Sequence, residues 1–232
     1  MNNVSSSEPS DPEERSAEAA RYALTRRLLP VLRHHMVVHL QPIGMIYEVL
    51  DRKLVTGLAD LAPIREGLGK INTLARSAID SCLDVVTWLA PDTDASIALG
   101  TGVNECLELL ASNFRFRGFT TSNQVGEVQL PVSRSDLREV LTSALMAATD
   151  GSSGPLELVL RAEVTADKAV VMIETRPGEG TGFTTEMAYR ALNWNDVQAL
   201  VGSHAVGLER EASVVRLTFA TKSDTSASGS AS

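Results

Sequence analysis

The sequence has no surplus of positive charge. Among its 232 residues, 21 Lys and Arg stand against 29 Asp and Glu, which gives a formal net charge of −8. Nucleic-acid binding depends on neutralising phosphates with a basic surface, so this balance argues against a nucleic-acid-binding protein. The sequence also has no run of about 18 apolar residues, the length that a membrane-spanning helix needs. We therefore expect neither nucleic acid nor a membrane among its partners.

The sequence has little cysteine and no segment typical of a secretory leader. Cys82 and Cys106 are its two cysteines, and their spacing indicates neither a disulfide framework nor a metal site. The first 15 residues are polar and acidic, whereas a signal peptide has a basic start and an apolar middle. We therefore expect a cytoplasmic protein. Residues 1–10 and 222–232 are Ser-rich and are predicted to be disordered tails.

Two long helices are predicted between residues 11 and 91. Asp11 is a helix N-cap followed by Pro12, and the apolar pattern then continues to about Leu54. A second helix begins at Ile64. In both helices one seam follows alternating spacings of three and four residues, which is typical of helix bundles. The seam residues are Leu29, Leu32, Met36, His39, Ile43, Ile46 and Leu50, then Ile64, Leu68, Ile71, Ala75, Ala78, Cys82, Val85 and Leu89.

Such a helical hairpin buries its own seam poorly. Two hairpins packed into a four-helix bundle would bury it well, so the pattern predicts a homodimer. The alternative is that residues 91–220 cover the seam within one chain.

The pattern changes after residue 91, and residues 92–221 are predicted to form an α/β domain. Helices are expected over Val103–Ser112, over Ser135–Thr149 with Ser135 as its cap, and over Glu186–Val201. Strands are expected within Phe119–Leu130 and over Leu156–Val164, Ala169–Thr175 and Ser213–Ala220. This order predicts an α+β protein in which a helical layer covers a mixed sheet.

Three of the four histidines fall within RHHMVVHLQP, residues 33–42. At about 100° per residue, His39 lies inside the seam, His35 on its flank and His34 nearly opposite. His35 and His39 have the i, i+4 spacing of a metal pair, but no third ligand stands nearby. The sequence therefore predicts no metal site, although a metal-sensing bundle remains an alternative. Exposed His34 shares its outer face with Val37, Val38, Gln41 and Met45, a set that indicates a docking surface.

The His34 helix resembles the dimerisation and phosphoacceptor helix of sensor histidine kinases. That family's helix carries His, an acid, an apolar residue, two variable positions, Pro and Leu, and residues 34–40 align with it without a gap. The resemblance places the phosphoacceptor at His34, with Arg33 and His35 as flanking, assisting residues. His35 stands where the family has the acid, and His39 stands where it has the proline.

Residues 92–221 resemble the histidine-kinase ATPase domain without its nucleotide motifs. Ser143 and Ala147 stand at the positions of the family's asparagines, and Thr175 stands at or beside that of its adenine-binding aspartate. Mg²⁺-bound ATP needs oxygen ligands that Ala147 cannot supply. Gly178, Gly180 and Gly182 keep a glycine-rich character that a loop can have without any phosphate.

Together, these residues resemble the histidine phosphotransferases of the ChpT type. The resemblance implies a dimeric four-helix bundle, an ATPase-like α/β sandwich, and relay of a phosphoryl group to or from response-regulator receiver domains through His34. No cofactor would be bound by this chain, because the partner receiver supplies Mg²⁺. Two other hypotheses are a catalytically inactive pseudo-histidine-kinase that regulates a response regulator or partner kinase, and a divergent ATP-dependent kinase.

Overall fold

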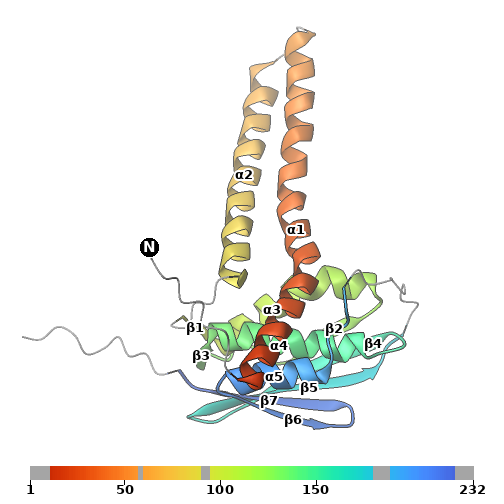
Figure 1. The fold of residues 1–232 in the computed structure, drawn as a ribbon. Coiled ribbons are helices and arrows are strands. Elements are labelled where there is room, and N and C mark those ends of the chain that lie inside the picture. Colours follow the sequence, from red (N-terminus) through yellow and green to blue (C-terminus); the bar gives the residue numbers. More distant parts are fainter. Residues whose placement is uncertain (1–10, 57–59, 90–94, 180–188, 223–232) are drawn as a thin grey trace, which may run out of the picture. The chain divides into compact units, whose positions relative to one another are not determined.

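The computed structural model describes residues 11–56, 60–89, 95–179 and 189–222 (Figure 1). These residues form two compact units. One unit comprises residues 28–91, and the other combines the chain up to Arg27 with the chain from Asp92 onward. The predicted tails fall outside the described residues, apart from Lys222.

The larger unit contains a five-stranded mixed sheet. Its strands are β2 (Thr120–Asn123), β4 (Leu156–Val164), β5 (Lys168–Pro177), β6 (Val206–Glu211) and β7 (Val214–Ala220), in the order β2-β4-β5-β7-β6. The β2–β4 pair is parallel and the other pairs are antiparallel. A second, small sheet pairs β1 (Ser96–Ala98) with β3 (Pro131–Ser133).

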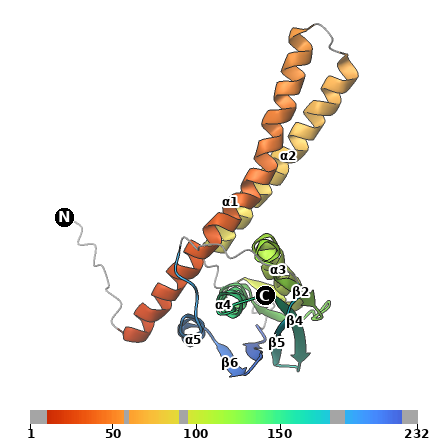
Figure 2. The same cartoon turned by 90° about the vertical axis from the view of Figure 1, so that its right-hand side faces the viewer.

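Three helices cover one face of the five-stranded sheet (Figures 1 and 2). They are α3 (Leu99–Phe116), α4 (Arg134–Asp150) and α5 (Trp194–Ser203). Leu137, Leu141 and Leu145 of α4 are completely buried, as are Leu160 of β4 and Ile173 of β5. Because strands alternate their side chains, only one face of the sheet needs this apolar cover. The predicted α+β architecture, with helices over a mixed sheet, is confirmed.

Helix caps set the starts of α4 and α5, and both starts differ from the sequence prediction. The α4 N-cap is Ser133, whose hydroxyl accepts a hydrogen bond from the Asp136 backbone N–H, and not Ser135. Helix α5 begins at Trp194, because Asn193 and Asp196 form a capping box, and residues 189–193 before it are not helical, contrary to the prediction. The predicted start, Glu186, lies outside the described residues. Strands β1, β3 and β6 were not predicted, since short strands carry too few residues for a period of two to be recognised.

Helix α1 (Pro12–Val55) contributes to both units. Its residues up to Arg27 pack with the α/β unit, whereas the sequence placed residues 11–91 in one helical region. The packed side is rich in alanine: Ala17, Ala20 and Ala23 are buried, together with Leu24. Small side chains let a helix approach its neighbours closely, which explains why this stretch of α1 associates with the α/β unit.

The smaller unit is an antiparallel hairpin of α1 residues 28–55 and α2 (Leu61–Leu89) (Figures 1 and 2). The Cys82 thiol lies 3.7 Å from the Met36 sulfur. Near the other end, Gly67 admits the side chain of Leu50, because a Cβ at position 67 would lie 2.8 Å from a Leu50 methyl carbon. Later residues of α1 thus face earlier residues of α2.

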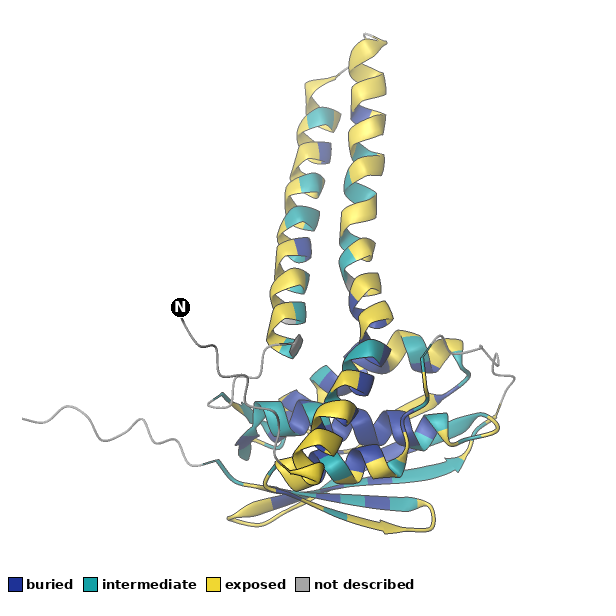
Figure 3. Cartoon of the chain, viewed as in Figure 1, coloured by how far each residue is buried: buried dark blue, intermediate teal, exposed yellow. Residues whose placement is uncertain are grey.

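The hairpin buries its predicted seam incompletely (Figure 3). Leu32, Leu50 and Ala78 are buried, but Leu68 is 55% exposed and Cys82 is also exposed. Most other seam residues are half-buried. Much apolar surface of the two helices therefore remains open in the single chain.

Candidate functional site

His34 is exposed on α1, as the helical pattern predicts. Its neighbour Arg33 is also exposed. Four more exposed residues share the His34 face, because at about 100° per residue they fall within a sector of roughly 100°. They are Val37, Val38, Gln41 and Met45. An exposed imidazole thus stands on a surface where three apolar side chains are 44–62% exposed.

The three histidines of residues 33–42 do not share one environment. His39 is half-buried on the seam side of α1, whereas His34 is exposed. The side chain of His35 lies outside the described residues. Where side chains are described, no three His, Cys, Asp or Glu residues gather as ligands for a metal ion.

The three positions that the sequence resemblance aligns with nucleotide ligands carry side chains with internal roles. Ser143 is buried in α4, and its hydroxyl donates to the Val140 carbonyl at 2.9 Å. Ala147 is buried one turn later and carries no polar group. The Thr175 hydroxyl donates to the Ser213 carbonyl at 3.1 Å. These side chains present neither a carboxylate nor an amide to a ligand.

The glycine-rich segment has a structural role at its first position. A Cβ on Gly178 would lie 3.0 Å from the backbone of Leu156, and the Gly178 N–H donates to the Pro155 carbonyl at 2.9 Å. Gly178 thus lets β5 close against the start of β4, with no need for a phosphate. Gly180 and Gly182 lie outside the described residues.

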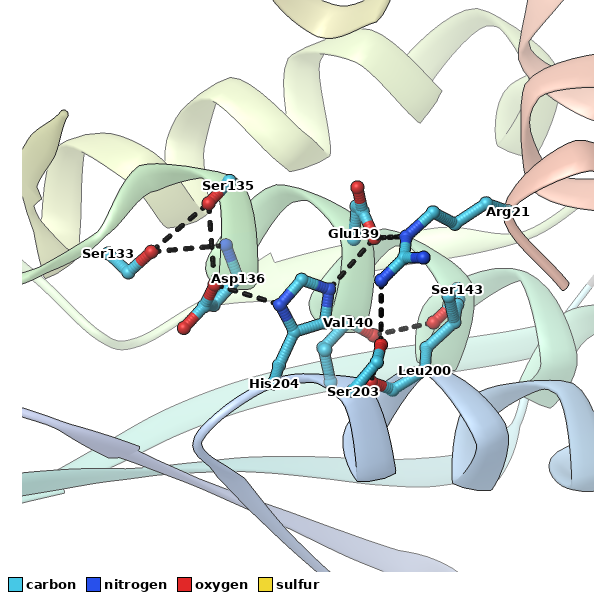
Figure 4. Close-up of polar contacts among 10 residues, drawn as sticks. All are labelled: Arg21, Ser133, Ser135, Asp136, Glu139, Val140, Ser143, Leu200, Ser203 and His204. Atoms are coloured by element: carbon cyan, nitrogen blue, oxygen red, sulfur yellow. Dashed lines mark hydrogen bonds and ion pairs between the residues drawn. The ribbon is translucent and has the colours of Figure 1, made fainter. Parts of the chain in front are cut away.

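His204, which no sequence pattern singles out, lies between two carboxylates of α4 (Figure 4). Its Nδ1 is 2.9 Å from Asp136 Oδ1 and its Nε2 is 2.8 Å from Glu139 Oε2. The hydrogen bonds to Asp136 and Glu139 raise the pKa of His204 to about 9, although burial opposes the rise. Only its being the fourth histidine marks it in the sequence, because both partners lie more than 60 residues away.

The same cluster includes the N-terminal part of α1. Arg21 Nε donates to Glu139 Oε2 at 2.9 Å, and another Arg21 nitrogen donates to the Ser203 hydroxyl at 2.7 Å (Figure 4). Burial raises the pKa of Glu139, but bonds and charges from His204 and Arg21 outweigh it and leave that pKa lowered. The hydrogen bond from His204 is the main reason that the pKa of Asp136 is lowered.

A buried carboxylate, that of Asp150, lies at the C-terminal end of α4. The Asp150 side chain is completely buried and accepts bonds from Arg27 at 2.6 Å and Arg117 at 2.8 Å. It also accepts the Leu192 N–H at 3.0 Å. Burial lowers the pKa of Arg27, against the attraction of Asp150. Two guanidinium groups thus compensate an acid at the negative end of the helix dipole.

Comparisons with known proteins return structures but no family. No family model and no curated relative matches the sequence. Histidine kinase AdeS of Acinetobacter baumannii is similar, with a TM-score of 0.40 and 15% identity over 78% of this chain and 95% of that chain. A histidine kinase from Burkholderia phymatum STM815 is similar with a TM-score of 0.42 and 12% identity, over 85% of this chain and 96% of that chain. A bacterial phosphotransferase is similar with a TM-score of 0.36 and 13% identity, over 84% of this chain and 95% of that chain. The residues of this chain are therefore the basis for its proposed function.

Across the parts of the chain that the structure describes, no helix combines the length and the apolarity that crossing a bilayer requires.

Proposed function

We propose that this protein is a cytoplasmic histidine phosphotransferase that relays a phosphoryl group between response-regulator receiver domains through His34. One observation carries the proposal: the histidine that aligns with the kinase phosphoacceptor is exposed on α1, among apolar side chains that are also exposed. An imidazole nucleophile must be open to its substrate, and a transient partner needs an apolar surface on which to dock.

The relay needs little from this chain beyond the imidazole. A neutral His34 nitrogen attacks the phosphorus of a receiver's aspartyl phosphate; the N–P bond forms as the bond from phosphorus to the aspartate oxygen breaks. The reverse step passes the phosphoryl group to the next receiver's aspartate. Mg²⁺ held by the receiver would offset the phosphate charge, as oxygen ligands do at other phosphoryl-transfer sites.

A relay without ATP agrees with the residues at the ATPase-like positions. The Ser143 hydroxyl donates a hydrogen bond to the α4 backbone, Ala147 has no ligand atom, and the Thr175 hydroxyl donates to the Ser213 carbonyl. These three side chains favour transfer between receivers over autophosphorylation.

Exposed apolar side chains beside the hairpin seam support a homodimer. On α1 they recur every seven residues, and on α2 they lie on one flank of the seam, about 50–110° from its mean direction, with Leu68 at the edge of the seam itself. They are Leu40, Tyr47 and Leu54 on α1, and Leu61, Leu68, Ile79, Leu83 and Val86 on α2. Because the helices are antiparallel, counting 100° per residue puts both stripes on the same side of the hairpin. A second hairpin laid on that side would complete a four-helix bundle.

Phosphotransfer from a phosphorylated receiver tests the relay. The wild-type chain should take up label, and His34→Ala should lose essentially all of it. His39→Ala, a half-buried histidine five residues away, is the matched control and should keep most of the uptake. Equal labelling of wild type and His34→Ala, or no labelling of either, would contradict the relay.

The second candidate is a catalytically inactive pseudo-histidine-kinase that binds a receiver or a partner kinase. Two sequence observations favour it. His35 replaces the acid that assists the family's histidine, and the family spacing measured back from Pro42 instead of His39 places Val37 at the histidine position. This candidate predicts that receiver binding is unchanged in His34→Ala and that no phosphohistidine forms.

A further inference from the structure

Helix α4 carries one line of polar and small positions toward the N-terminal part of α1. Asp136, Glu139, Ser143, Ala147 and Asp150 fall within a sector of roughly 80°, counting 100° per residue. Ser143 and Ala147, the positions that correspond to nucleotide ligands, therefore lie between Glu139 and Asp150 on one line. A phosphate placed there would meet carboxylates on both sides.

Helix α1 of the same chain binds both ends of this line. Arg21 pairs with Glu139, and Arg27 pairs with Asp150. Between these two arginines, α1 presents Leu24, which is 4% exposed, and just before them Ala20 is completely buried. Figure 1 shows this first part of α1 (red) crossing α4 and α5.

Two further contacts extend the attachment beyond α4. Arg21 reaches the Ser203 hydroxyl at the end of α5, and the Arg26 guanidinium lies 4.3 Å from the centre of the Tyr189 ring. Arg26 also lies over Tyr22 of its own helix. The first part of α1 is thus held by α4, by α5 and by the segment that leads into α5.

We propose that Pro12–Arg27 is a resident pseudoligand: a helix with arginines six positions apart that occupies, in cis, the α4–α5 face where the kinase fold would hold a nucleotide. The proposal deepens the nucleotide-free part of the proposed function and rests on it. Charge complementarity argues for this occupant, because the acids that flank Ser143 and Ala147 each bind a guanidinium group of α1 in addition to His204 or Arg117. The face is a site for a basic helix.

Ala20→Glu in the full-length chain tests the proposal. A longer, charged side chain at a completely buried position should release the segment, so hydrogen exchange at residues 12–27 should become at least about tenfold faster while the strands stay protected. Ala19→Glu is the matched control, because Ala19 is exposed. It should behave like the wild type.

A labelled peptide of residues 11–28 then reports whether the released face still binds a helix. Fluorescence anisotropy should show binding to Ala20→Glu at least about tenfold tighter than to the wild type, whose face is already occupied. A peptide with Arg21→Glu and Arg27→Glu should not bind, and added salt should weaken the wild-type peptide. A fluorescent ATP analogue with Mg²⁺ should bind neither chain.

Three results would overturn the proposal. The first is an unchanged hydrogen-exchange rate at residues 12–27 in Ala20→Glu. The second is faster exchange there without binding of the peptide. The third is binding of the ATP analogue to Ala20→Glu. If Ala20→Glu unfolds the sheet, the full-length variant with Arg21→Glu and Arg27→Glu is used in its place. Hydrogen exchange, peptide binding and ATP-analogue binding are then measured on that variant. Absence of labelling in the wild-type chain, or equal labelling of wild type and His34→Ala, would refute the relay and leave the peptide result standing, so the two failures are distinguishable.

Discussion

His204 makes stability of the α/β unit depend on pH in the alkaline range. Its folded-state pKa of about 9 lies above the ordinary value of 6.5, so the protonated imidazole stabilises the fold fully below pH 6.5. That contribution is lost as the pH rises through 9. In urea unfolding, the free energy of unfolding of the wild type should fall by about 3 kcal/mol between pH 6.5 and pH 9.5.

Removing the imidazole should remove this pH dependence. We expect His204→Asn to be less stable at pH 6.5, because Asp136 and Glu139 lose a charged partner, and to change little between pH 6.5 and 9.5. His34→Asn, at an exposed position, should keep the wild-type profile. A His204→Asn chain that still lost stability over the same interval would show that another group is responsible.

Ala212 stores backbone strain in the turn between β6 and β7. Its φ is 45°, and it is the single non-glycine residue with positive φ among the described residues. A left-handed conformation costs an L-residue about 1 kcal/mol, which glycine avoids. Ala212→Gly should therefore raise the free energy of unfolding by up to about 1 kcal/mol in urea. Ala205→Gly, in a neighbouring turn without positive φ, should give no gain.

At the scale of elements, the two exposed stripes of the hairpin predict where a second chain binds. Leu40→Glu combined with Leu68→Glu places charges in the proposed bundle core, so light scattering should show a dimer for the wild type and a monomer for this variant. Met45→Glu is the matched control. Its side chain is also exposed, but it lies on the His34 face, so the dimer should persist while receiver binding weakens. A dimer that survives the double substitution would contradict this bundle.

Most elements could be predicted from sequence because each has a local signal. The long helices follow their heptad spacing, and β4 and β5 follow alternation around a turn. The start of α5 was predicted too early because the apolar pattern upstream of Trp194 resembles a helix. The capping box of Asn193 and Asp196, whose residues are also visible in the sequence, sets the first residue of α5.

At the scale of the whole molecule, the two units should unfold differently. If the hairpin is stabilised by a second chain, its transition depends on protein concentration, whereas that of the α/β unit does not. Roughly hundredfold dilution should lower the melting temperature of a helical transition by several degrees and leave the other unchanged. Calorimetry at two concentrations would measure both. Two concentration-independent transitions would argue for a monomeric hairpin.

The sequence by itself determined the helices, the main strands and the exposure of His34, because helical and strand periods are local properties of a chain. The resemblance to the histidine-kinase ATPase domain also singled out Ser143, Ala147 and Thr175, whose side chains are poor nucleotide ligands. Only the tertiary structure decided that residues 12–27 pack on the α/β unit and that His204, Asp136, Glu139 and Arg21 form one cluster. These contacts join residues more than 60 positions apart, and no local pattern encodes which distant carboxylate an arginine or histidine will meet.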